Sequence, residues 1–115
     1  MSNGKCGRHV PAFVLLLLAE EPAYGSMLLN KMNERLPYNN IDGAALYRAL
    51  KDLLKMNAVT AYWDTTEPGP PKKWYKITPL GLEKLAEYNE DIQQRIKNLQ
   101  FFLSHYKKMF VQEEK

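Results

Sequence analysis

The chain has 115 residues, of which 45% are hydrophobic and 25% charged, and its net charge is +3. This length and composition predict a single globular domain with a modest core. The mild positive charge permits a nucleic-acid partner but does not by itself indicate one. Cys6 is the only cysteine, which excludes an internal disulfide and, with no secretory signal, favours a reducing cytoplasm.

The first part of the chain predicts two helices after a flexible N-terminal segment, residues 1–9, in which Cys6 is interpreted as an ordinary thiol. The apolar run Val10–Ala19 is too short to cross a bilayer, which needs ~20 residues, so no membrane partner is expected. It predicts instead a buried helix over about Val10–Glu20. A second helix is expected over about Tyr24–Leu36, because apolar residues recur there at helical spacing.

The run "IDGAALYRALKDLLKMN" predicts a third helix, with Asp42 as its N-cap and Asn57 in the left-handed turn after it. Its apolar stripe is Leu46, Leu50, Leu53 and Leu54. Its opposite face carries Ala44, Tyr47, Arg48, Lys51 and Lys55. Cations and a phenol on one face suit base edges and phosphates in a DNA groove, and free N–H groups at the helix start suit a phosphate. A merely solvated helix face is the alternative.

Two strand-like runs, "AVTAYWDTTE" and "KKWYKIT", predict a β-hairpin with a protruding tip at Pro68–Pro71. Lys72 and Lys73 flank this tip, where they would reach a phosphate backbone; an ordinary solvated turn is the alternative reading. Trp63 and Trp74 are expected to pack within the hairpin rather than to stack on a ligand. Three helices followed by a hairpin outline a winged helix-turn-helix domain over residues 10–78.

The last part of the chain, residues 79–115, predicts one long helix, with Thr78 as its N-cap and an end near Phe110. At ~1.5 Å per residue it would be about 48 Å long, which overshoots the core of the preceding domain. A second copy of the chain is the simplest partner for its near-heptad apolar seam. The seam consists of Leu85, Tyr88, Ile92, Ile96, Leu99, Leu103, Tyr106 and Phe110. The fold class expected is therefore mainly α (α+β), a winged helix-turn-helix with a two-stranded wing and a C-terminal dimerisation helix.

Three segments together resemble the PadR family of transcriptional regulators: "LLLLAEEPAYGSMLLNKM", "LYRALKDL" and "NAVTAYWDTTEPGPPKKWYKITPLG". The single C-terminal helix resembles the compact branch of that family. The resemblance implies a dimeric winged-helix repressor, often one that senses a small molecule. It would place Tyr47, Arg48 and Lys51 against DNA and make Gly69 to Lys73, including Pro70, the wing. The chain departs from the family at Ala44 and Ala45, where Gly and a hydroxyl residue are common, and at Tyr24, where His is common; Tyr24 is kept among the candidate DNA contacts.

No enzyme chemistry is expected, because His9 and His105 lie in separate elements and no phosphate-binding loop is present. One cysteine and two separated histidines favour no metal site and no cofactor. Glu20 and Glu21 are interpreted as a solvated pair. Phe101 and Phe102 on the long helix are candidates for an effector pocket between two copies, with simple packing as the alternative. The rival to a DNA-binding regulator is a winged-helix module that binds protein and does not bind DNA specifically.

Overall fold

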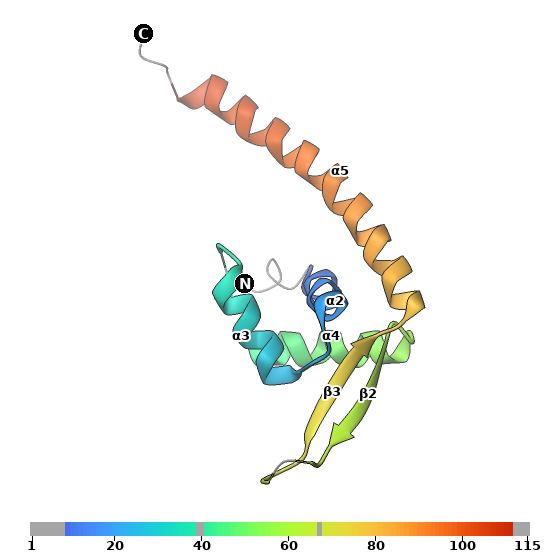
Figure 1. Ribbon diagram of the computed structural model, residues 1–115. Helices are drawn as coiled ribbons and strands as arrows, with labels where there is room; N and C mark the ends of the chain where they lie inside the picture. The colour runs from blue at the N-terminus through green and yellow to red at the C-terminus, as the bar shows by residue number, and fades with distance from the viewer. Residues whose placement is uncertain (1–8, 39–40, 67, 112–115) are drawn as a thin grey trace. The chain divides into compact units, whose positions relative to one another are not determined.

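The structure, a computed structural model, describes residues 9–38, 41–66 and 68–111. Cys6 and most of the predicted flexible segment lie outside the described residues. By its contacts the chain divides into two units, Met1–Leu85 and Ala86–Lys115. The elements in order are α2 (Val10–Glu20), β1 (Ala23–Tyr24), α3 (Gly25–Arg35), α4 (Gly43–Lys55), β2 (Val59–Asp64), β3 (Lys72–Ile77) and α5 (Pro79–Phe110), as Figure 1 shows.

The core of the first unit is built around α2, which is apolar on most of its sides. Its buried residues are Val10, Ala12, Val14, Leu15, Leu17 and Leu18. Leu28 and Met32 of α3 and Leu46, Leu50 and Leu53 of α4 complete the core. This confirms the interpretation of the apolar run as a core helix. Within the described residues, no helix is both long and apolar enough to cross a membrane.

The sheet has three antiparallel strands in the order β1-β3-β2, whereas the sequence predicted only the two of the hairpin. The added strand is two residues long, and it pairs Ala23 with Tyr75 and Tyr24 with Trp74. Its formation depends on the neighbouring strand, and the second helix consequently begins at Gly25, one residue later than expected. The hairpin itself is confirmed, and its tip extends away from the helices (Figure 1).

Asn57 and Thr78 join α4, the hairpin and α5 at one place. Asn57 has a φ of 61°, so the left-handed turn expected after the third helix is confirmed. The Thr78 hydroxyl donates to the Asn57 carbonyl over 2.7 Å and accepts from the Gly81 N–H over 2.9 Å, so the predicted cap of α5 is also confirmed. Gly81 is buried, and a Cβ there would overlap the Ala58 carbonyl oxygen. The start of α5 is therefore fixed to the turn after α4.

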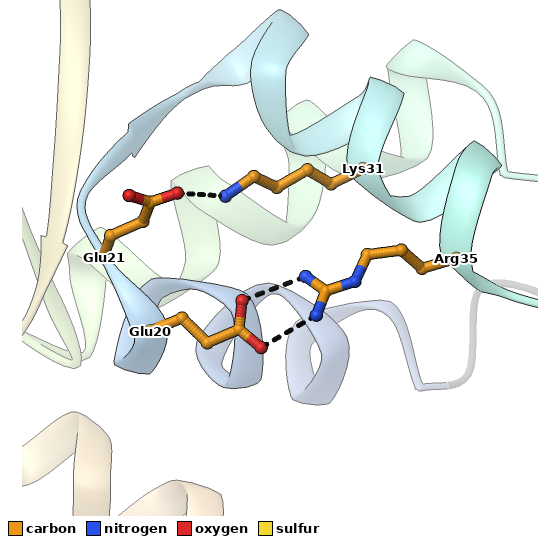
Figure 2. A network of polar contacts seen from close by, with 4 residues as sticks. All are labelled: Glu20, Glu21, Lys31 and Arg35. Atoms are coloured by element: carbon orange, nitrogen blue, oxygen red, sulfur yellow. Dashed lines mark hydrogen bonds and ion pairs between the residues drawn. The ribbon is translucent and has the colours of Figure 1, made fainter.

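Two ion pairs connect the end of α2 to α3 (Figure 2). The Arg35 guanidinium donates to both Glu20 oxygens, over 2.9 and 3.0 Å, and Lys31 pairs with Glu21 over 2.6 Å. The hydrogen bond from Arg35 is the main cause that holds the pKa of Glu20 below its usual value. The two glutamates form ion pairs with cations of α3 and stay exposed, with 45% of the Glu20 and 59% of the Glu21 side chain accessible, which agrees with the interpretation of a solvated pair.

The long helix α5 runs from Pro79 to Phe110, as the sequence predicted. In the single chain its apolar seam is uncovered from Ile96 onward, since Leu99 is 62% exposed and Leu103 is 65% exposed. Aromatic side chains four residues apart stack along it, with 5.0 Å between the ring centroids of Tyr106 and Phe110. Water contact with so much apolar surface is unfavourable, and an exposed apolar stripe of this length is typical of an interaction surface.

Candidate nucleic-acid interface

The outer face of α4 carries the predicted row of DNA contacts. Leu46, Ala49, Leu50 and Leu53 face the core, and this leaves Ala44, Tyr47, Arg48, Lys51 and Lys55 exposed. Within the described part of the chain, Arg48, Lys51 and Lys55 have no ion-pair partner. The three cations outnumber Asp52, the exposed carboxylate among them, so this side of α4 carries a net positive charge that suits a phosphate-lined groove.

The N-terminus of α4 is capped by a carboxylate. The Asp42 side chain accepts a hydrogen bond from the Ala45 N–H over 2.8 Å, which confirms the predicted cap. The same contact uses one of the free N–H groups and places negative charge at the helix start. The helix start is therefore less suited to a phosphate than the sequence alone indicated.

Tyr47 connects α4 to the sheet, although it is 51% exposed. Its ring lies against Gly25 at the start of α3, where a Cβ would overlap the Tyr47 hydroxyl. Tyr75 of β3 is close by: burial, and to a smaller degree Tyr47, raise the pKa of the Tyr75 phenol above its usual value. The hydroxyl end of Tyr47 packs on Gly25, while about half of the residue's surface stays exposed.

Lys72 and Lys73 lie on opposite faces of the hairpin, because successive residues of a strand alternate. Lys73 shares a face with buried Tyr75, and its Nζ lies 5.9 Å from the centroid of the Trp63 ring and 5.8 Å from that of Tyr75. Lys72 lies on the other face, opposite Asp64 in the strand register. The two lysines that flank the tip therefore cannot act as a single charged cluster.

Tyr24, Pro70 and Lys72 gather around a groove between the wing and the start of α3. The groove has a volume of about 220 Å³ and is lined by Tyr24, Met27, Asp64, Pro68, Pro70, Lys72 and Trp74. The Trp74 ring packs edge-on against Tyr24 at 5.1 Å between centroids, and the Lys72 amine lies 5.3 Å from the Tyr24 ring centroid. Trp74 thus packs within the sheet as expected.

Hydrogen bonds to Asp64 fix the start of the wing tip, and the backbone turns at Gly69. The Asp64 carboxylate accepts from the Thr66 N–H over 3.0 Å and from its hydroxyl over 2.8 Å. These hydrogen bonds are the main cause that lowers the pKa of Asp64, with Lys72 adding a smaller effect. Gly69 has a φ of 98°, a conformation that favours glycine. The tip is thus shaped by local bonds rather than by the core.

The predicted site residues form two groups: the exposed row on α4, and the groove around Tyr24, Pro70 and Lys72 with Gly69 at the tip. Lys73 belongs to neither, since it lies with Trp63 on the core side of the wing. Trp63 is 62% exposed, so its predicted packing role is wrong. The sequence analysis missed this exposure. The alternation of the strand could have indicated it, because Trp63 lies two residues beyond Ala61, the last partly covered position on that face of β2. Within the described residues, no group of three or more potential metal ligands is present.

The chain matches the model of the transcriptional regulator PadR-like family over residues 14–87. It is 32% identical over 82 residues to an uncharacterised protein of Lysinibacillus sphaericus, a match that covers 69% of this chain and 73% of that protein. A PadR-like transcription factor from Bacteroides fragilis is 25% identical, with a TM-score of 0.70, 86% of this chain and 94% of that chain covered. A PadR family regulator from Clostridium difficile is 21% identical, with a TM-score of 0.71, and the match covers 83% of this chain and 98% of that chain. This similarity supports the fold.

Proposed function

The chain belongs to the PadR-like family of transcriptional regulators, and from this premise we propose that it binds operator DNA in a sequence-specific way and represses transcription. Members of this family are transcription regulators, so the chain is not an enzyme. Its place of action in this proposal is the cytoplasm, where bacterial and archaeal DNA lies. The reading helix is α4, and the β2–β3 hairpin is the wing.

The observation that carries this proposal is the net positive row on α4, whose cations have no ion-pair partner in the described residues, beside a protruding hairpin that also carries lysine. Arg48 has the bidentate geometry that recognises guanine edges, whereas Lys51 and Lys55 suit phosphates. Tyr47 donates its hydroxyl to a phosphate from a ring held against Gly25. On the wing, Gly69, Pro70, Lys72 and Lys73 lie near the backbone of the flanking groove.

The regulator acts as a homodimer in this proposal, with α5 as the dimerisation helix. The uncovered seam from Ile96 to Phe110 supports it, because a second copy offers an identical apolar seam. Two copies would place two α4 helices on half-sites about one DNA turn apart, ~34–36 Å. The domain division that follows is residues 10–78 for DNA and 79–115 for the dimer.

The proposal also includes a small apolar or aromatic effector that binds the dimer and releases it from DNA. Phe102 stacks on the seam residue Tyr106, with 6.3 Å between ring centroids. At ~100° per residue, Phe101 lies about 200° from Leu103, on the side of α5 away from the seam, so the effector site rests on Phe102. Titrating the protein–DNA complex with small aromatic compounds tests it: release that is unchanged in Phe102→Ala contradicts this site.

Salt dependence separates this function from the protein-binding rival. A labelled duplex from the region upstream of the protein's own gene, and a scrambled duplex of equal length, are titrated at two salt concentrations and followed by fluorescence anisotropy. Cation–phosphate contacts release counterions, so affinity should fall steeply as salt rises, and the native duplex should bind more tightly. Weak binding that is equal for both duplexes and insensitive to salt would favour the rival, a winged-helix module for a protein partner.

A further inference from the structure

The face of the wing that carries Trp63 continues the core side of the sheet. In the register, Val59 is opposite Ile77, Ala61 opposite Tyr75, and Trp63 opposite Lys73, so these six residues share one face. Val59 and Tyr75 are buried against the helices, with 2% and 6% of their surface exposed. Trp63 and Lys73 lie one step farther toward the tip, beyond the helices, and their face is uncovered there.

This face also adjoins the reading helix. Helix α4 packs on β2, and the Tyr47 ring of α4 lies against Gly25 at the start of α3. Following β3 from Tyr75 toward the tip, the next side chain on the same face is Lys73, and Trp63 is directly across from it. Tyr75, Lys73 and Trp63 thus lead from the covered part of the sheet toward the wing tip.

The charges of the two wing faces differ. On the far face, Asp64 lies opposite Lys72, and the attraction between them offsets part of the lysine charge. On the Trp63 face, the groups beside the Lys73 amine are two aromatic rings, and no carboxylate of the paired strand positions faces it. Rings on both sides hold the ammonium in place while leaving its positive charge uncompensated.

We propose that Trp63 and Lys73 contact the sugar–phosphate backbone of double-stranded DNA, with Lys73 binding a phosphate and the Trp63 indole packing against the adjacent deoxyribose. An aromatic side chain that is 62% exposed beside an oriented ammonium fits a surface that alternates apolar sugar and anionic phosphate. Lys72, on the opposite face, does not share this contact. The inference rests on the proposed function and refines which side of the wing meets DNA.

The contact is independent of sequence, which makes its mutational signature distinct from that of a base-reading residue. Trp63→Ala should weaken the native and the scrambled duplex by the same factor, about tenfold for a buried aromatic anchor. The matched control is Tyr62→Ala, since Tyr62 is the preceding residue, is 45% exposed and lies on the other face of β2. Lys73→Ala should act as Trp63→Ala does, and Lys72→Ala should have the smaller effect.

Fluorescence tests the contact without a change in Trp63. The chain has only two tryptophans, so Trp74→Phe leaves Trp63 as the sole indole. The exchange is mild, because the buried Trp74 Nε1 has no hydrogen-bond partner in the described structure and a phenyl ring keeps the packing on Tyr24. Saturating this variant with duplex should change the Trp63 emission. In the reciprocal Trp63→Phe variant, the Trp74 emission should change less, because the Trp74 side chain is half-buried against Tyr24.

The outcomes separate the two proposals. DNA binding by anisotropy together with an emission change that is larger for Trp63 than for Trp74 supports the contact. DNA binding with unchanged Trp63 emission, and equal affinities for Trp63→Ala and Tyr62→Ala, overturns the contact and leaves the proposed function standing. No binding of the intact chain to either duplex at low salt overturns both.

Discussion

Gly25 has no Cβ, and the Tyr47 ring occupies the space that a Cβ would fill. A Cβ at this position would overlap the end of the Tyr47 side chain, which is able to move, rather than backbone. Tyr47 also contributes to the raised pKa of the Tyr75 phenol, although burial is the larger cause. The absence of a side chain at Gly25 therefore allows Tyr47, a candidate phosphate contact on α4, to pack against the start of α3.

Gly25→Ala should displace the Tyr47 ring and destabilise the fold by about 1 kcal/mol, at the low end for overpacking, because the obstructing atoms belong to a side chain. Urea denaturation followed by circular dichroism measures the loss, and the affinity for DNA should fall with it. Gly43→Ala is the control, since nothing lies within 4 Å of a Cβ there. Equal effects of the two substitutions would contradict this account of Gly25.

At the scale of the elements, the Thr78 hydroxyl makes two hydrogen bonds just before the start of α5. It links the first turn of the helix to the carbonyl of Asn57, while the Thr78 N–H donates to the Ala58 carbonyl over 3.0 Å. The position of the hairpin end and of the helix start therefore depends on one short joint rather than on a broad interface.

Thr78→Val keeps the shape of the side chain and removes the hydroxyl. It should lower the free energy of unfolding by about 1–2 kcal/mol, the usual cost of a lost cap. Thr78→Ser retains the hydroxyl and should stay within a few tenths of a kcal/mol of the original chain by the same measure. A valine variant as stable as the serine variant would show that the cap contributes little.

The helices were largely predictable because local residues determine where they begin and end. These residues are the Asp42 and Thr78 caps, the Asn57 turn and the prolines. The strand β1 was not, because Ala23 and Tyr24 become a strand only through pairing with β3. The candidate site divides in the same way. The cationic face of α4 follows from helical spacing, whereas the Tyr47–Gly25 contact depends on how distant elements pack.

For the whole molecule, the uncovered seam of α5 is the feature that a single chain leaves unexplained. An apolar stripe of this length stabilises a dimer only if it remains continuous, since one buried charge without a partner costs more than several contacts contribute. In the proposed dimer the DNA affinity would also rise, because the second half-site would be bound at a high effective concentration.

Leu99→Glu should convert the dimer to a monomer, which sedimentation velocity of the intact chain at several concentrations would show. Gln94→Glu adds the same charge five residues earlier, about 140° round the helix and away from the seam, and should leave the dimer intact. The monomer should also lose most of its operator affinity. A dimer that survives Leu99→Glu would place the interface elsewhere on the chain.

The central claim is that α4 reads DNA sequence, and the ratio of affinities for the native and the scrambled duplex measures it most directly. For the original chain this ratio should be large, and Arg48→Ala should reduce it about 10- to 100-fold, because a bidentate contact with a base contributes ~1–3 kcal/mol of discrimination. Lys51→Ala should instead weaken both duplexes alike. A ratio near one for the original chain, or one that Arg48→Ala leaves unchanged, would contradict the assignment of α4 as the reading helix.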